Sequence, residues 1–153
     1  HEAFDRLKEQ GKVRYIGAGA SAKSPYEAPD RYMSTEPIDF IGVDYAVNNR
    51  SAEEPLLRLA QDKGIAVMGY VPFRDFRDRV KGLEVPGWAA EFGAKTWAQF
   101  CLKFAASHPA VTVVTPATSH PQHMRENMEA ARGRLPDEAE RRHMIEFVDA
   151  LPA

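Results

Sequence analysis

Residues 59–71, LAQDKGIAVMGYV, contain the end of a helix, a glycine and a strand in immediate succession. Helix-type sequence runs to Lys63, and Gly64 follows it with the positive φ angle at which helices commonly end. The apolar run Ile65 to Val71 then begins without a longer loop. Near-continuous apolar character is typical of a parallel strand, which is covered on both faces. This stretch therefore predicts a helix that leads directly into a buried parallel strand.

Three further apolar runs are also followed by helix-like stretches: Val13 to Ala18, Ile38 to Tyr45 and Val111 to Thr115. Such alternation predicts a parallel sheet with helices packed outside it. Eight such units close a TIM barrel, which typically needs about 250 residues, whereas this sequence has 153 and opens within a helix pattern, Glu2 to Gln10. We expect an α/β fold that is the second half of a (β/α)8 TIM barrel, with four parallel strands each followed by a helix. A small open α/β sandwich, stable alone, is the alternative.

Four helix starts carry a capping-box pattern, in which Ser, Thr or Asp precedes Glu or Gln by three residues. They lie at Ser24, Ser51, Thr96 and Asp137. No domain boundary is visible, so residues 1–153 are expected to form a single domain. The long irregular segment Pro72 to Lys95 follows a predicted strand, and post-strand loops of a barrel lie on the face where ligands bind. We interpret this segment as a long post-strand loop that forms a lid, with a disordered loop as the alternative.

Composition describes an ordinary globular chain, with a net charge of -2 and 44% hydrophobic residues. No basic stripe indicates nucleic-acid binding. No apolar run reaches the roughly 18 residues of a membrane span, and no signal peptide is visible. The single cysteine, Cys101, excludes an internal disulfide, and its apolar surroundings predict a buried structural thiol. We expect a cytoplasmic protein without nucleic-acid or membrane partners.

The segment between the last strand and the helix that begins near Pro121 is the strongest candidate site on physical grounds. Free backbone N–H groups at the start of that helix, with the hydroxyls of Thr118 and Ser119, predict an anion pocket suited to a nucleotide phosphate. The alternative is that Ser119 only caps the helix. His120 and His123 are three residues apart but have no further ligand at suitable spacing, so no metal site is predicted.

Three side chains at strand ends are further candidates for a pocket. Tyr70 closes the third predicted strand, where its ring would either stack on a flat ligand or belong to the core. Asp44 lies inside an apolar strand, and a buried carboxylate needs partners or a role. Tyr45 follows it. No Ser/His/Asp or Cys/His nucleophile arrangement is visible in the sequence.

Taken together, several of these stretches resemble the aldo-keto reductases in their order and spacing. The matching residues are 11–17, 59–67, 97–100, 102–104, 107–111, 116–121 and 126–127. The resemblance implies the fifth to eighth βα units of the barrel and NAD(P)H-dependent carbonyl reduction. The family's catalytic tyrosine, lysine, aspartate and histidine lie in its first four units. No catalytic residue is therefore assigned in this chain.

The resemblance also implies part of a site for NAD or NADP. Tyr70 matches the position that stacks on the nicotinamide, and Thr118 and Ser119 suit the phosphates. Glu126 and Asn127 match residues that hold the adenine.

At several other positions the chain departs from the family's pattern. Gly19, Ala20 and Gly42 stand where polar residues usually hold the nicotinamide amide. Ala117 and His123 replace the lysine and arginine that bind the 2′-phosphate of NADP, which favours NAD slightly. Asp44 and Tyr45 match positions beside the nicotinamide.

Three hypotheses follow. In the first, the chain is the C-terminal half of an aldo-keto reductase-like protein and supplies cofactor-binding loops, with a missing N-terminal half-barrel as its partner. In the second, the half-barrel dimerises with a second copy of itself through its open sheet. It would then have lost redox chemistry and act as a non-redox enzyme or a small-molecule binding module. In the third, the chain is a truncation product without a function of its own.

Overall fold

The computed structural model describes residues 2–20, 27–73 and 76–152 of the chain. In this part, four parallel strands form one sheet in the order β1-β2-β3-β4. They are β1 (Gly17–Ala20), β2 (Phe40–Asp44), β3 (Ala66–Tyr70) and β4 (Val113–Val114). This confirms the predicted α/β fold with parallel strands that alternate with helices.

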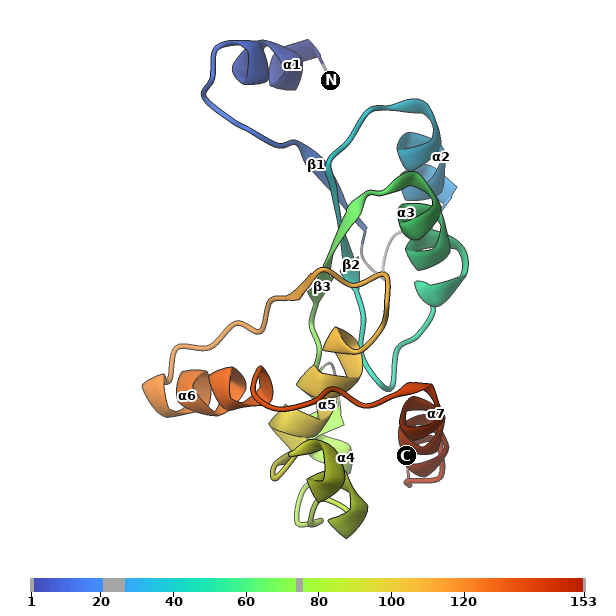
Figure 1. The fold of residues 1–153 in the computed structure, drawn as a ribbon, viewed down its shortest axis with the longest axis vertical. Helices are drawn as coiled ribbons and strands as arrows, with labels where there is room; N and C mark the ends of the chain where they lie inside the picture. Colours follow the sequence, from blue (N-terminus) through green and yellow to red (C-terminus); the bar gives the residue numbers. More distant parts are fainter. Residues whose placement is uncertain (1, 21–26, 74–75, 153) are drawn as a thin grey trace.

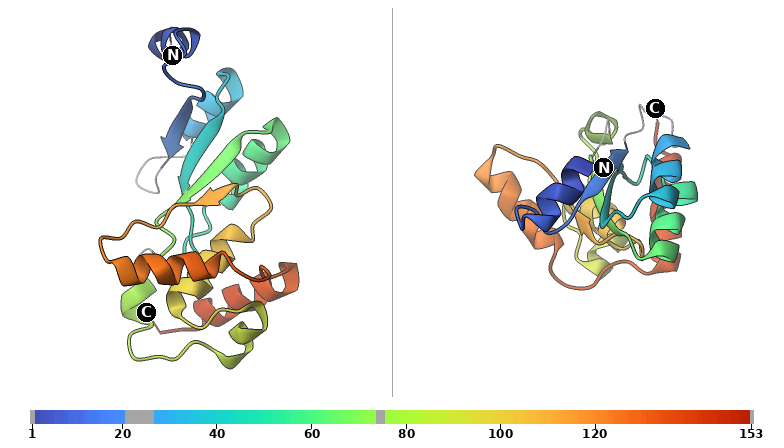
Figure 2. Two further views of the ribbon diagram at one scale, coloured as in Figure 1. Left: turned by 60° about the vertical axis from the view of Figure 1, so that its left-hand side comes forward. Right: turned by 90° about the horizontal axis from the view of Figure 1, so that it is seen from above.

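The helices fall into two groups (Figures 1 and 2). Near the beginning of the chain are α1 (Glu2–Glu9), α2 (Glu27–Thr35), the π-helical turn η1 (Glu53–Leu57) and α3 (Arg58–Lys63). The later ones are α4 (Phe76–Arg79), the 3-10 helix η2 (Gly87–Phe92), α5 (Trp97–Ala106), α6 (Pro121–Ala130) and α7 (Glu138–Asp149). Helices α4 to α7 gather around the end of the sheet at which the strands finish (Figures 1 and 2). Loops that follow the strands are thereby brought close to the starts of later helices.

The two faces of β3 differ in burial, whereas β2 is buried on both faces from Ile41 to Asp44. Along β3, Val67 and Gly69 are buried, whereas Met68 and Tyr70 are only half-buried. Alternate residues of a strand point to opposite faces, so one face packs on helices and the other is partly exposed. The partly exposed face is the one that would line the interior of a closed barrel.

The first strand begins later than the predicted run from Val13 to Ala18. The backbone N–H of Ile16 donates to the Asp39 carboxylate at 2.9 Å, which also accepts from Lys8 Nζ at 2.9 Å. Regular pairing starts only at Gly17, opposite Phe40. A Cβ at Gly17 would lie 2.5 Å from the Phe40 carbonyl oxygen, so the close approach of these strands requires glycine.

Two of the predicted capping boxes form caps. Thr96 Oγ1 accepts from the Gln99 N–H at 3.2 Å, and Asp137 and Glu140 form a complete capping box at α7. The prediction at Ser51 is wrong, because η1 has Ala52 at its N-cap with no side-chain cap hydrogen bond. Glu54, which stands three residues after Ser51, has extended backbone angles (φ −119°, ψ 116°), so the helical spacing that a capping box needs is absent. The predicted cap at Ser24 lies outside the described residues.

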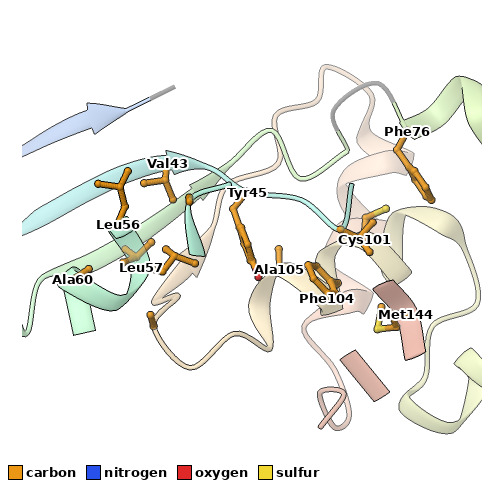
Figure 3. Packing of buried hydrophobic residues seen from close by; sticks show 14 of the residues in the cluster. Val43, Tyr45, Leu56, Leu57, Ala60, Phe76, Cys101, Phe104, Ala105 and Met144 are labelled. Carbon is orange, nitrogen blue, oxygen red and sulfur yellow. The ribbon is translucent and has the colours of Figure 1, made fainter. Parts of the chain in front are cut away.

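The hydrophobic core lies between the sheet, α5 and α7 (Figure 3). Phe104 of α5 and Met144 of α7 are both fully buried. Cys101 lies among them at 1% exposure, as predicted, and burial raises the pKa of its thiol to about 12. Such a thiol stays protonated and unreactive at neutral pH.

The segment from Pro72 to Lys95 contains α4 and η2, and part of it packs on the later helices. The ring of Trp88 lies 5.8 Å from those of Phe100 and Phe147. Tertiary contacts of this kind add stability that neither short helix has by itself. The role of the segment as a lid stays a prediction.

Candidate functional site

A cavity of about 370 Å³ lies where the segments that follow β3 and β4 meet. Phe73 and Arg77 line it from the segment after β3, and residues 96–98 line it from the start of α5. The remaining wall comes from the loop after β4 and from α6: Ala117, Thr118, His123, Glu126 and Asn127. Four of the residues predicted from sequence for a cofactor site, Thr118, His123, Glu126 and Asn127, are therefore brought together.

The beginning of α6 explains this arrangement. Pro121 occupies the first turn of the helix, and Thr118 Oγ1 accepts a hydrogen bond from the backbone N–H of the N-cap residue, His120, at 3.1 Å. In the helix that follows, His123, Glu126 and Asn127 have the spacing i, i+3, i+4, which puts them on one face. The turn and the helical repeat thus direct one hydroxyl, one imidazole and two further polar groups toward the same cavity.

The side chain of Asn127 is the most informative of these groups. Asn127 is only 8% exposed, and within the described part of the chain its amide has no hydrogen bond to protein. The amide atoms are not among the fully enclosed polar atoms of the described residues, which are Asn48 Oδ1 and Asn49 Nδ2. Because this amide lines the cavity, a bound molecule with complementary hydrogen-bonding atoms would provide the missing partner.

Ser119 and Tyr70 are not among the residues that line the cavity. Ser119 is exposed, and it does not cap α6, whose N-cap is His120. Tyr70 lies at the end of β3 with its ring over Gly42 of β2, since a Cβ at Gly42 would lie 2.2 Å from the ring. The Tyr70 ring therefore occupies the space of a side chain at position 42.

Asp44 and Tyr45 lie at the end of β2. Asp44 is 7% exposed and pairs in register with Tyr70. Tyr45 is fully buried, and its ring points from β2 toward α5, beside Phe104 (Figure 3). Tyr45 thus belongs to the core under the site, and it does not line the cavity.

The hydroxyl of Tyr45 is part of a buried polar cluster. It donates to Glu53 Oε1 at 2.5 Å and accepts from Arg141 Nη2 at 2.7 Å. Burial is the main cause that raises the pKa of Tyr45 above its usual value, so the phenol stays protonated. This cluster joins the loop after β2 to α7.

Sequence reasoning missed two of the groups described above. Arg77 lies on a wall of the cavity that comes from a different post-strand segment, and no local motif marks it. Arg141 did leave a signal, because it shares the helical spacing of the buried residues Met144 and Val148. An arginine on the apolar face of a helix indicates a buried polar partner.

The described residues contain no group of three or more His, Cys, Asp or Glu side chains that could hold a metal ion. None of the helices in the described ranges is long and apolar enough to span a membrane.

Comparison with known proteins identifies relatives. Residues 1–75 match the model of the Aldo/keto reductase family. The chain is 26% identical to the NADH-specific methylglyoxal reductase of Escherichia coli (strain K12), an alignment that covers 97% of this chain and 52% of that protein.

Solved structures of aldo-keto reductases also align with this chain and share its fold. The aldo-keto reductase AKR11C1 from Bacillus halodurans aligns with a TM-score of 0.73 at 21% identity, over 96% of this chain and 54% of that one. The thermostable aldo-keto reductase Tm1743 aligns with a TM-score of 0.67 at 26% identity, over 99% and 53%. An aldo-keto reductase from Klebsiella pneumoniae in complex with NADP and acetate aligns with a TM-score of 0.73 at 20% identity, over 96% and 52%. The chain spans about half the length of these relatives. It is therefore homologous to the aldo-keto reductases, over a length that corresponds to about half of their barrel.

Proposed function

We propose that this chain supplies the C-terminal half of an aldo-keto reductase-like barrel, the fifth to eighth βα units. In this proposal its cavity holds the adenosine end of NAD or NADP for carbonyl reduction. The observation that carries the proposal is the convergence of Thr118, Glu126 and Asn127, whose amide has no hydrogen bond within the described residues, on a cavity near the ends of parallel strands. Ligands of open parallel sheets and barrels bind at that end.

The groups around the cavity fit an adenosine. An amide offers both donors and an acceptor to a base edge, and Glu126 offers a carboxylate that accepts from an amino group. The hydroxyl of Thr118 and the start of α6 suit a phosphate. When bound, the nicotinamide supplies hydride chemistry. This chain contributes binding and orientation, and the general acid would come from the other half of the barrel.

Cofactor titration followed by fluorescence tests the proposal. We expect saturable binding of NADH or NADPH in the micromolar range. Asn127→Leu, which keeps the branched shape of the side chain but has no hydrogen-bonding group, should weaken binding about tenfold, because one hydrogen bond of roughly 1.4 kcal/mol is lost. Gln122→Leu is the matched control, since Gln122 lies on the same helix, is exposed and does not line the cavity.

Two results would contradict this proposal. Absence of binding by the unmodified chain up to millimolar concentrations would refute a cofactor site. Equal affinities of the Asn127 and Gln122 variants would show that Asn127 does not contact the ligand.

We propose the missing half-barrel as the partner that completes the fold. A mainly apolar groove of about 520 Å³ runs along β4 between α5 and α6, where Val113, Met124 and Met128 are exposed. A strand with an unpaired edge and apolar surroundings favours pairing with another strand. Because the relatives are about twice as long, the groove suits the strand that follows β4 around a closed barrel.

Native mass spectrometry tests this assignment. We expect the chain to form a one-to-one complex with a co-expressed half that contains the first four βα units of the parent barrel. If the chain formed only a homodimer and did not bind the co-expressed half, the assignment would be contradicted, and closure of the barrel by a second copy would be favoured.

A second function has one observation in its favour. The ring of Tyr70 fills the space over Gly42, near the end of the site where the sequence lacks polar groups for a nicotinamide. This supports a binding module for another small molecule that has lost redox chemistry. A homodimer without affinity for NADH or NADPH would favour this function over the first.

A further inference from the structure

The turn between α5 and β4 is closed by a histidine side chain. The imidazole Nδ1 of His108 accepts a hydrogen bond from the backbone N–H of Ala110 at 3.1 Å, and the carbonyl oxygen of His108 accepts from the N–H of Val111 at 2.9 Å. Ala110 is buried, and a backbone N–H at a buried residue needs a hydrogen-bond partner. The side chain of His108 therefore fixes the turn through which the chain enters β4.

The hydrogen bond to Nδ1 requires a neutral imidazole. A ring nitrogen of histidine accepts a hydrogen bond only when it carries no proton, so the hydrogen of the neutral ring is on Nε2. Protonation of His108 adds a hydrogen to Nδ1, which would then face the N–H of Ala110. Two donors cannot form a hydrogen bond with each other. The charged ring must therefore turn away, and the N–H of Ala110 loses its partner.

The surroundings of the His108 ring also disfavour its charged form. The ring is half-buried and lies edge-on to the ring of Tyr45, with 5.6 Å between the two centroids. Burial and the charge of Arg141 lower the pKa of His108, whereas the charge of Glu53 acts in the opposite direction. Three further charged groups, from the beginning of α7, line the same cavity as His108: Asp137, Glu138 and Arg142.

This second cavity has a volume of about 410 Å³ and is separate from the cavity at Asn127. None of the residues that line one of these two cavities lines the other. Because the ring of His108 lines the second cavity and is only half-buried, water can reach it in the folded chain. Proton exchange at His108 therefore does not require unfolding.

We infer that His108 is a pH-sensitive contact, which holds the turn before β4 while its imidazole is neutral and releases that turn when the imidazole is protonated. Thr112, directly after the turn, donates from its N–H to the carbonyl oxygen of Val67 at 3.0 Å and accepts from the Val67 N–H through Oγ1 at 3.0 Å. The turn thus positions the last strand of the sheet, and β4 leads into the loop that contains Thr118. The inference does not depend on the proposed function.

The direction of the pH effect follows from the lowered pKa of His108 in the folded chain. In the unfolded chain the imidazole has its ordinary pKa of about 6.5, so the unfolded state binds more protons at mildly acidic pH. The contribution of His108 to stability is therefore complete above about pH 6.5 and is lost as the pH falls below that value. Carboxyl groups titrate mainly below about pH 5, so the range from about pH 7.5 to about pH 5.5 reports on histidines.

The experiment compares four forms of the chain: unmodified, His108→Asn, His108→Phe and His120→Gln. Asparagine keeps an acceptor for a backbone N–H two residues further on and does not titrate, whereas phenylalanine keeps a ring but has no acceptor. His120→Gln is the matched control, because His120 is exposed and lines neither cavity. Each form is unfolded in urea at about pH 7.5 and at about pH 5.5. Hydrogen exchange of the Ala110 amide, relative to its intrinsic rate at each pH, is measured by NMR.

We expect the unfolding constant of the unmodified chain to rise severalfold, up to about tenfold, between the two pH values. The upper limit follows because a free imidazole at about pH 5.5 is protonated in about ten molecules for each neutral one. Protection of the Ala110 amide should fall over the same range. The His120→Gln form should behave like the unmodified chain. The His108→Asn form should keep Ala110 protected at both pH values and lose the rise, and the His108→Phe form should be destabilised by a similar factor at both.

Two results would overturn the inference. If the unfolding constant of the His108→Asn form rose as much as that of the unmodified chain, another group would be the source of the pH dependence. If the Ala110 amide of the unmodified chain were equally protected at both pH values, protonation would not release the turn. Both results come from forms that keep an acceptor for Ala110, so they decide the question even if the His108→Phe form does not fold.

Discussion

Replacing Arg141 with leucine is expected to lower the free energy of unfolding by about 3 kcal/mol, as for other buried charged groups whose partners are left behind. Arg141 is 9% exposed and donates from Nη1 to the Phe104 carbonyl at 2.5 Å and to Ser107 Oγ at 2.7 Å. From Nη2 it donates to the Tyr45 hydroxyl at 2.7 Å, with Glu53 at 3.4 Å. Leucine would fill part of the volume but leave Glu53 without its cation. Urea denaturation would measure the change.

The neighbouring residue provides the control. Arg142 pairs with Glu138 at 3.7 Å, but both side chains are more than two-thirds exposed. Exposed pairs of this kind contribute little, so Arg142→Leu should change stability by about 0.5 kcal/mol or less. Equal effects of the two substitutions would show that the buried cluster of Arg141, Tyr45 and Glu53 does not stabilise the fold.

Replacing Lys103 with methionine is expected to lower the free energy of unfolding by about 2 kcal/mol, because two carbonyl groups lose a charged donor. Lys103 is fully buried, and its Nζ donates to the carbonyl oxygens of Arg132 at 2.7 Å and Arg134 at 3.0 Å. Burial, with the nearby charge of Arg134, lowers the pKa of the Lys103 ammonium. The lysine thereby fixes the connection between α6 and α7 onto α5, and urea denaturation would measure its contribution.

Lys95→Met is the matched control for this substitution. Lys95 is exposed just before α5, and its backbone N–H, which the substitution keeps, donates to Gln99. The free energy of unfolding of the Lys95→Met variant should stay within about 0.5 kcal/mol of that of the unmodified chain. If Lys103→Met were equally neutral, the hydrogen bonds to the α6–α7 connection would carry no net stability.

The contacts of Arg141 and Lys103 connect the C-terminal helix α7 with the part of the chain that forms the cavity. Arg141 attaches α7 to the loop after β2, and Lys103 fixes the segment that separates α6 from α7. Asn127 and Glu126 lie on α6, whose C-terminal end leads into that segment. Stability of these contacts therefore maintains the wall of the cavity that is proposed to hold the adenosine.

Elements with strong local signals were predictable from the amino-acid sequence alone. Gly64 ends α3 with a φ of 67° and leads into β3, as the stretch 59–71 predicts. Thr96 and Asp137 begin helices because their side chains bond backbone N–H groups only three residues away. The same holds for one wall of the cavity, since residues three and four apart on α6 share a face regardless of the rest of the fold.

What only the tertiary structure decided depends on residues that are far apart in the sequence. Arg141 and Tyr45 are 96 residues apart, and their hydrogen bond directs Tyr45 into the core, away from the cavity. Glu53, 88 residues from Arg141, joins the same cluster. Arg77 lines the cavity from α4, which contacts α5 through the ring of Trp97 and the end of α7 through the carbonyls of Val148 and Leu151. Local sequence sets backbone preferences within a few residues, whereas the direction of a side chain depends on which distant groups satisfy its charge and fill the space around it.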